Sequence, residues 1–146
     1  MDIHEGGCAC GAVRYRVKGS PERASVCHCT FCQRRTGSAF GISVYFHDED
    51  VEILRGELKT YDHRSDESNR LLRMQFCTNC GTTVTWTLEL LPGARGIAAG
   101  TFDDPSWLKI ERHLWTRSAH PWVILPGDVE KFEKSALQKP TKLQAR

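Results

Sequence analysis

The chain of 146 residues has the usual length of one domain and is long enough to bury its own core. Its formal net charge of +2 is too small to indicate nucleic-acid binding, and no run approaches the roughly 20 apolar residues of a membrane span. We therefore expect neither a nucleic-acid partner nor a membrane partner. Residues 1–7 are acidic and glycine-containing, unlike the basic and apolar start of a secretory signal, so we expect a cytoplasmic location.

Short strand-like runs dominate the chain. Residues 12–18 alternate strictly, with Val13, Tyr15 and Val17 on one side and basic side chains on the other, which predicts a half-buried strand. Turn-forming glycine, proline and aspartate separate this run from the others. The other predicted strands span residues 39–46, 51–54, 70–76, 82–88, 96–100 and 112–117. The pattern predicts a mainly β domain.

One helix is predicted, near the C-terminus. Residues 128–138 place Asp128 as a cap after Gly127, and Val129, Phe132 and Ala136 follow at helical spacing. Beyond Lys139 we expect a frayed tail. We accordingly divide the chain into a main domain, residues 1–125, and a C-terminal helix with its tail, residues 126–146.

Seven cysteines fall into three clusters, and none follows the last of them. In a chain without an export signal, an odd number of cysteines indicates metal ligands or reactive thiols rather than a disulfide framework. The clusters are Cys8 and Cys10; Cys27, Cys29 and Cys32; and Cys77 and Cys80.

The first and last clusters predict a closed four-sulfur zinc site. Cys8 and Cys10 point the same way if their segment is extended, because side chains two apart share a face. Cys77 and Cys80 have the spacing of a zinc knuckle, and Gly81 is free to adopt the positive φ that such a turn requires. Since four thiolates leave no open position, we expect this zinc to be structural and to join the first strand to the hairpin after Phe76.

The middle cluster predicts an open, catalytic zinc site. Cys27, Cys29 and Cys32 supply three sulfur ligands within six residues, and no cysteine remains to complete the shell. Three protein ligands and one exchangeable position are the pattern of a catalytic zinc. Three thiolates make the metal a weak activator of water and a good partner for another sulfur ligand. The expected substrate is therefore a small thiol, which coordination would deprotonate.

A second structural site, completed by a histidine, is the alternative for this cluster. His28 is a poor fourth ligand in an extended segment, because its side chain would point away from Cys27 and Cys29. It can instead orient the ligand residues without binding the metal itself. His113 and His120 are less constrained by the sequence.

Three further residues are candidates for substrate binding. Arg34 and Arg35 directly follow the middle cluster, where they would offset its negative charge or hold a substrate carboxylate. A solvated basic pair is the alternative. Trp122 follows Pro121 and would wall a pocket, or else pack in the core.

At this point the chain resembles the glutathione-dependent formaldehyde-activating enzymes, a family also described as centromere protein V-like. The resemblance covers roughly residues 5–125 and includes all seven cysteines in order and spacing. The resembling segments are residues 7–11, 27–32 with 36–40, 76–81 and 113–122. The family implies an Mss4-like fold, a structural zinc on Cys8, Cys10, Cys77 and Cys80, and a catalytic zinc on Cys27, Cys29 and Cys32.

The resemblance also implies an activity. The family's founding reaction joins formaldehyde to glutathione as S-hydroxymethylglutathione, which is carbon–sulfur lyase chemistry in the reverse sense. Our leading hypothesis is therefore a zinc-dependent carbon–sulfur lyase that acts on glutathione or a similar thiol, with two zinc ions per chain. The alternative is a non-catalytic, zinc-stabilised protein-binding module. A methionine sulfoxide reductase is less consistent, because no cysteine follows Cys80 to serve as nucleophile.

Overall fold

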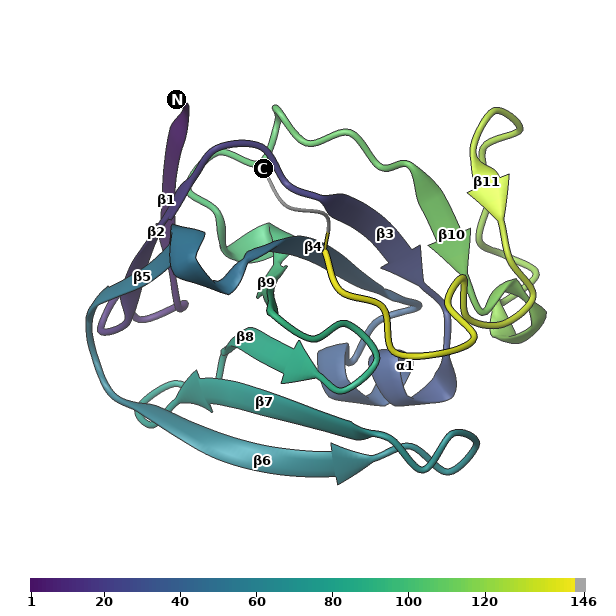
Figure 1. Ribbon diagram of the computed structural model, residues 1–146, viewed down its shortest axis with the longest axis horizontal. Coiled ribbons are helices and arrows are strands. Elements are labelled where there is room, and N and C mark those ends of the chain that lie inside the picture. Colours follow the sequence, from purple (N-terminus) through teal and green to yellow (C-terminus); the bar gives the residue numbers. More distant parts are fainter. Residues whose placement is uncertain (144–146) are drawn as a thin grey trace.

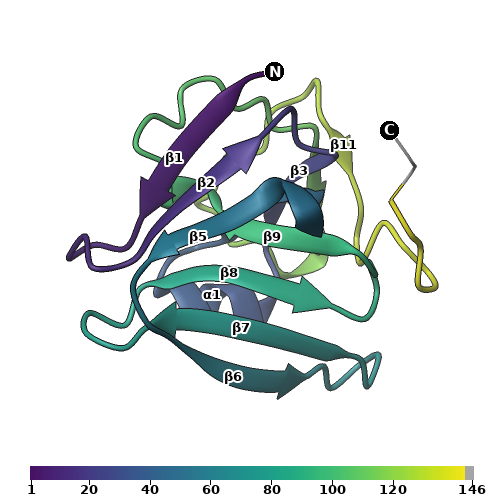
Figure 2. The same cartoon turned by 60° about the vertical axis from the view of Figure 1, so that its left-hand side comes forward.

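The computed structural model describes residues 1–143, which form two β-sheets (Figures 1 and 2). The smaller sheet is antiparallel and has the strand order β1-β2-β5. Its strands are β1 (Ile3–Gly7), β2 (Arg14–Lys18) and β5 (Val51–Arg55).

The larger sheet has eight strands in the order β11-β10-β3-β4-β9-β8-β7-β6. Neighbouring strands are antiparallel except that β10 runs parallel to both β3 and β11. Its strands are β3 (Arg23–Cys27), β4 (Gly41–His47), β6 (Leu58–Arg64), β7 (Leu71–Cys77), β8 (Thr83–Leu88), β9 (Ala94–Ala98), β10 (Arg112–Leu114) and β11 (Glu130–Lys131). The prediction of a mainly β domain is confirmed.

The main core lies between the two sheets. Tyr15 and Val17 of β2 are fully buried, as the alternation of residues 12–18 predicts, and they pack with Val44 and Phe46 of β4. Because successive side chains of a strand point to opposite faces, Ser43 and Tyr45 lie on the other face of β4. One face of the larger sheet therefore builds the core, and its other face is free to build a site.

The α-helix of the described residues is α1 (Thr30–Thr36), which the sequence reading did not anticipate. Cys29 caps its first turn, and its last turn ends at Gly37, whose φ of 65° is the left-handed conformation that glycine adopts without strain. The described part of the chain also forms three 3₁₀ turns: η1 (Asp48–Asp50), η2 (Ala99–Thr101) and η3 (Thr116–Ser118). In Figure 1, α1 lies between the end of β3 and the strands β7 and β8.

The predicted helix over residues 128–138 is wrong. The segment instead forms turns and the short strand β11, which pairs with β10. Its backbone bonds pass to a neighbouring segment rather than along a helix: Phe132 N–H donates to the carbonyl of His113 at 2.9 Å, and Trp115 N–H donates to that of Lys134 at 3.1 Å. The last part of the expected frayed tail, residues 144–146, lies outside the described residues.

No helix in the described part of the chain has the length and apolar character that crossing a bilayer requires.

Candidate metal centres and the cavity beside them

Four cysteines from two distant turns meet at one end of the core. Cys8 follows β1, Cys10 lies in the next turn, Cys77 ends β7 and Cys80 lies in the turn before β8. Their four sulfur atoms all lie within 4.8 Å of one another. Gly81 has a φ of 78°, as the knuckle spacing predicts. The structure therefore joins the first strand to the hairpin β7–β8 through a possible metal centre.

The sulfur spacing fits a zinc ion. Zn–S bonds of about 2.3 Å in a tetrahedron place neighbouring sulfur atoms about 3.8 Å apart. The Sγ atom of Cys10 lies 3.6 Å from that of Cys8 and 3.8 Å from that of Cys77. Four thiolates of this geometry fill a tetrahedral shell, so the donor set suits a closed structural site.

Backbone amides support the thiolate form at this centre. Val13 N–H donates to the sulfur of Cys8 at 3.2 Å, and Asn79 N–H donates to that of Cys77 at 3.3 Å. Hydrogen bonds from the Thr82 hydroxyl and amide lower the pKa of Cys80 to about 5. Hydrogen bonds of this kind stabilise the negative charge that a metal ligand carries.

The middle cysteines form a second cluster where β3 passes into α1. Cys27 is the last residue of β3, Cys29 caps α1 and Cys32 lies in its first turn. Their three sulfur atoms lie within 4.8 Å of one another, and the cluster of ligand atoms within that limit contains no other described residue. The strand end and the helix start together bring three ligands to one point.

Hydrogen bonds link the three thiols to one another. The Cys29 sulfur accepts hydrogen bonds from Cys27 and Cys32 and from the Cys32 amide, and its pKa is lowered to about 3. The pKa of Cys27 is raised well above its ordinary value, first by its hydrogen bond to Cys29, and that of Cys32 is raised to about 11. Negative charges this close repel, so all three thiolates need a bound cation.

The three candidate histidines are held by other partners. His28 is fully buried, and its Nε2 atom lies 2.9 Å from Nδ1 of His113. His120 Nε2 lies 2.8 Å from Oε1 of Gln33. These pairings disfavour the alternative in which a histidine completes the three-sulfur centre.

Gln33 is a supporting residue that sequence reasoning missed. Its amide nitrogen donates to the carbonyl of His28 at 2.9 Å and to that of Ser118 at 3.1 Å. It thereby ties α1 to His28, which lies between Cys27 and Cys29, and to the turn η3. A polar side chain next to a helix cysteine is too weak a signal to show this role from sequence.

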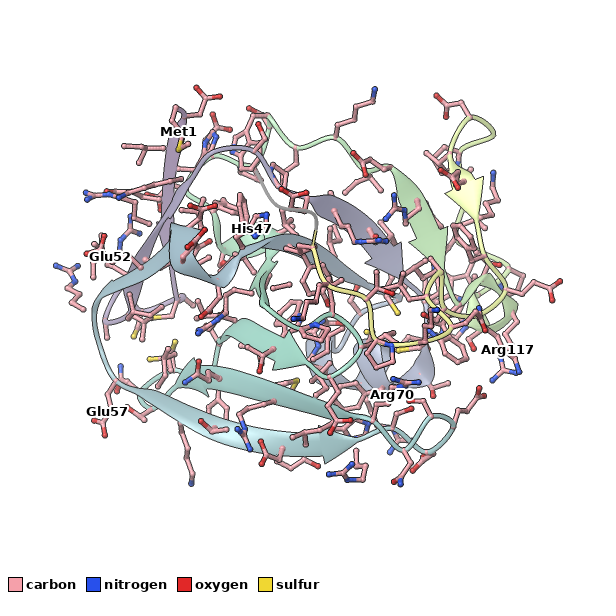
Figure 3. The ribbon with its side chains drawn as sticks, in the orientation of Figure 1. Met1, His47, Glu52, Glu57, Arg70 and Arg117 are labelled. Carbon is pink, nitrogen blue, oxygen red and sulfur yellow. The ribbon has the colours of Figure 1, made fainter. Side chains whose placement is uncertain are left out.

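A cavity of about 950 Å³ opens beside the three-cysteine centre and is lined by Cys27, Cys29 and Cys32. Arg34 and Arg35 line it as well, so the structure brings both arginines singled out in the sequence to the cavity wall. Arg70 and Arg117 add positive charge to the wall and lie on the same side of the molecule (Figure 3).

Arg35 packs over Trp86 in the cavity wall. Its guanidinium carbon lies 4.7 Å from the centre of the Trp86 ring, a cation–π distance. Gly41 makes room for it, because a Cβ atom at that position would lie 2.6 Å from Nη2 of Arg35. Arg35 also lowers the pKa of Cys32, although other contacts outweigh it. Its charge therefore faces the three-cysteine centre rather than bulk solvent alone.

Two distant segments complete the cavity wall. The tip of the β6–β7 hairpin contributes residues 65–68, and the chain after β11 contributes residues 134–135 and 137–138. Glu67, in the tip of the hairpin, forms ion pairs with Arg117 of η3 and, at 3.9 Å, with Lys134 after β11. Phe31 of α1 stacks on His63 of β6, with ring centres 3.7 Å apart. Contacts that the sequence alone does not show thus complete the cavity wall.

Trp122 does not join this site. Its side chain is 69% exposed and stacks on His120 with ring centres 4.8 Å apart. It is not among the residues that line the cavity. Its predicted place in a pocket wall and its alternative place in the core are both corrected, because the turn after His120 carries it to the surface.

Residues 3–118 match the model of one protein family, the glutathione-dependent formaldehyde-activating enzymes. The chain belongs to this family. The resemblance recognised in the cysteine spacing is thereby confirmed. The family match ends at residue 118, so it does not include residues 134–135 and 137–138 of the cavity wall.

A crystal structure of a Rhodobacter sphaeroides protein, determined as a structural genomics target, has a similar fold. Its TM-score is 0.56 at 22% sequence identity, and the match covers 87% of this chain and 98% of that one. At this identity the likeness supports the fold alone. The mainly β, Mss4-like architecture is in agreement with the sequence expectation.

Proposed function

We propose that this family member catalyses the addition of a small thiol, such as glutathione, to formaldehyde, and the reverse cleavage of the carbon–sulfur bond. The observation that carries the proposal is the three-sulfur centre, with no fourth ligand among the described residues, at the wall of a cavity of about 950 Å³. Cavities of about 300–1,000 Å³ commonly hold small ligands.

Two zinc ions per chain belong to this proposal. Cys8, Cys10, Cys77 and Cys80 would hold one that stabilises the fold, and Cys27, Cys29 and Cys32 would hold the other. Bound to the second set, zinc would favour the thiolate form of a substrate thiol over the thiol. Both sets need reduced cysteines, a state that the glutathione pool of the cytosol maintains, and we accordingly place the activity in the cytoplasm.

The protein's own residues would orient the thiol and exclude water. Arg34 and Arg35 give the wall beside the cysteines a positive charge, which attracts a thiol that carries carboxylates. The stacked pair Phe31 and His63 covers one side of the cavity. A substrate held between these walls meets the carbonyl compound in a fixed geometry, which lowers the entropic part of the barrier.

The experiment that tests the proposal follows formaldehyde and glutathione by NMR, with and without the zinc-loaded protein. We expect the adduct to form faster with the protein, and we expect Cys29→Ser to remove the difference. The spontaneous reaction is the essential control, so each rate is corrected for the protein-free mixture at the same pH.

The competing function is a zinc-stabilised module that binds a protein without chemistry. No acceleration with formaldehyde, together with no heat of binding for glutathione or other cellular thiols, would replace the lyase proposal by this one.

A further inference from the structure

Three polar side chains line the floor of the cavity on the sheet face opposite the core. Ser25 of β3 stands directly across from Ser43 of β4, and both are buried. Tyr45, two residues further along β4, lines the same cavity, as does Cys27 at the end of β3. Residues two apart on a strand share a face, so the floor runs from the cysteine centre through the serines to Tyr45.

The hydrogen bonding of Tyr45 leaves its own proton available. Trp86 Nε1 lies 2.9 Å from the phenolic oxygen, and an indole N–H can only donate, so the oxygen is the acceptor. This contact fixes the phenol in position. Gly96 permits it, because a Cβ atom there would lie 2.3 Å from Nε1 of Trp86. The phenol also shares a hydrogen bond with the Ser43 side chain, so its O–H can donate either to Ser43 or to a ligand on the floor.

The charge around Tyr45 suits a donor near the cysteine centre. Burial raises the pKa of Tyr45 to about 12, and negative charge at Cys32 and Cys27 adds to the rise. The phenol therefore keeps its proton at neutral pH, and it lines the same cavity as the cysteine centre. Arg35, which lies over the Trp86 ring, cannot supply a proton because a guanidinium does not deprotonate in proteins.

We propose that Tyr45 is the catalytic proton donor of the thiol–aldehyde addition, an inference that rests on the proposed function. The thiol sulfur bonds to the carbonyl carbon, the carbon–oxygen double bond becomes single, and its electron pair moves to the oxygen. The Tyr45 hydroxyl passes its proton to that oxygen. The proton that the entering thiol releases returns to the phenolate, so the sum is thiol plus aldehyde to hydroxyalkyl thioether. In the reverse direction Tyr45 acts as the base.

The first test compares Tyr45→Phe with the unaltered protein. Because general acids contribute about 10²- to 10⁴-fold, we expect the protein-dependent rate constant of adduct formation to fall at least about a hundredfold. Glutathione affinity, measured by titration calorimetry on the zinc-loaded protein, should stay within about twofold because Tyr45 acts on the developing oxygen rather than on the thiol. Tyr61→Phe, which alters an exposed phenol on β6, is the matched control and should keep the full rate.

A second measurement covers the case in which Tyr45→Phe disturbs Trp86 or fails to fold. Ring fluorination lowers the pKa of a phenol, so the chain is produced with fluorinated tyrosine at its three tyrosine positions. The alkaline fall of the rate should then move to lower pH. An unmoved alkaline limb, or a Tyr45→Phe variant that keeps the rate, would overturn this inference alone. No acceleration by the unaltered protein would overturn the proposed function and the inference with it.

Discussion

Nε2 of His28 lies 2.9 Å from Nδ1 of His113, and the two rings stack with centres 5.2 Å apart. His28 is fully buried and its Nδ1 atom has no hydrogen-bond partner among the described residues. One proton between the rings satisfies this contact, whereas a second would place a positive charge in a buried pair. Burial accordingly lowers the pKa of both histidines, and His113 adds to the effect on His28.

This pair predicts a loss of stability in mild acid. A histidine with a lowered folded pKa binds its proton more readily in the unfolded chain, so stability falls as pH drops from the unfolded pKa of about 6.5 toward the folded pKa. We expect the free energy of unfolding in urea to decrease between about pH 7 and 5.5. His113→Asn should flatten part of this slope. An identical slope in the variant would show that the pair does not cause it.

The two cysteine centres should respond differently to the loss of one ligand. Structural zinc contributes about 10–16 kcal/mol to small zinc modules, so Cys77→Ser should prevent stable folding. Cys29→Ser should leave a folded domain that holds less zinc. Circular dichroism and metal analysis of both variants check this. A folded Cys77→Ser protein beside an unfolded Cys29→Ser protein would reverse the assigned roles.

Arg35→Met should weaken thiol binding without unfolding the domain. The change keeps an unbranched, mostly apolar side chain and removes the charge at Trp86 and the cysteine centre. Since a charge-assisted hydrogen bond contributes about 1.5–3 kcal/mol, we expect glutathione affinity to fall at least about tenfold. Calorimetric titration measures this, and Arg73→Met, at an exposed ion pair with Asp62, is the matched control. Equal glutathione affinities for the two variants would show that Arg35 does not bind the thiol substrate.

Gln33→Leu should destabilise the loop around the three-cysteine centre. The variant leaves the carbonyls of His28 and Ser118 without the donor that now joins them, and an unpaired buried group costs about 1–3 kcal/mol. Urea unfolding gives the loss directly. The exposed Gln138 offers a control, because its replacement by leucine should change stability by less than about 0.5 kcal/mol. Equal free energies of unfolding for Gln33→Leu and the unaltered protein would mean that the two hydrogen bonds of the Gln33 amide do not contribute to stability.

Much of the fold follows from local sequence pattern, and the failures have local causes. Local pattern predicts the strands β2, β4, β7 and β8, because apolar and polar side chains alternate along them or cluster in β-branched runs. β3 was missed because Ala24, Ser25 and Val26 are buried together, which removes the alternation. β6 was missed because its side chains are mostly exposed. The C-terminal segment has helical spacing, but pairing with β10 satisfies its backbone instead.

The site was predictable only in part for the same physical reason. Cysteine spacing places three ligands at Cys27, Cys29 and Cys32 without knowledge of the fold. Tyr45 and Trp86 meet only because β8, β9 and β4 are neighbours in the sheet, so no local pattern joins them. The alternation of Ser43 and Tyr45 with Val44 and Phe46 was the available signal for a polar face. Trp122 is a case in which a local pattern misleads. An aromatic residue after proline favours a pocket wall or the core, but Trp122 lies at the surface.

The most direct measurement of the central claim is a glutathione titration of the cobalt-substituted protein, followed through the sulfur-to-metal charge-transfer bands. An open position at Cys27, Cys29 and Cys32 predicts a saturable change in these bands as a thiolate joins the centre. The change should be absent in Cys29→Ser, whose four-cysteine centre remains intact. A spectrum of the unaltered protein that does not respond to glutathione or to any other small thiol would contradict the account.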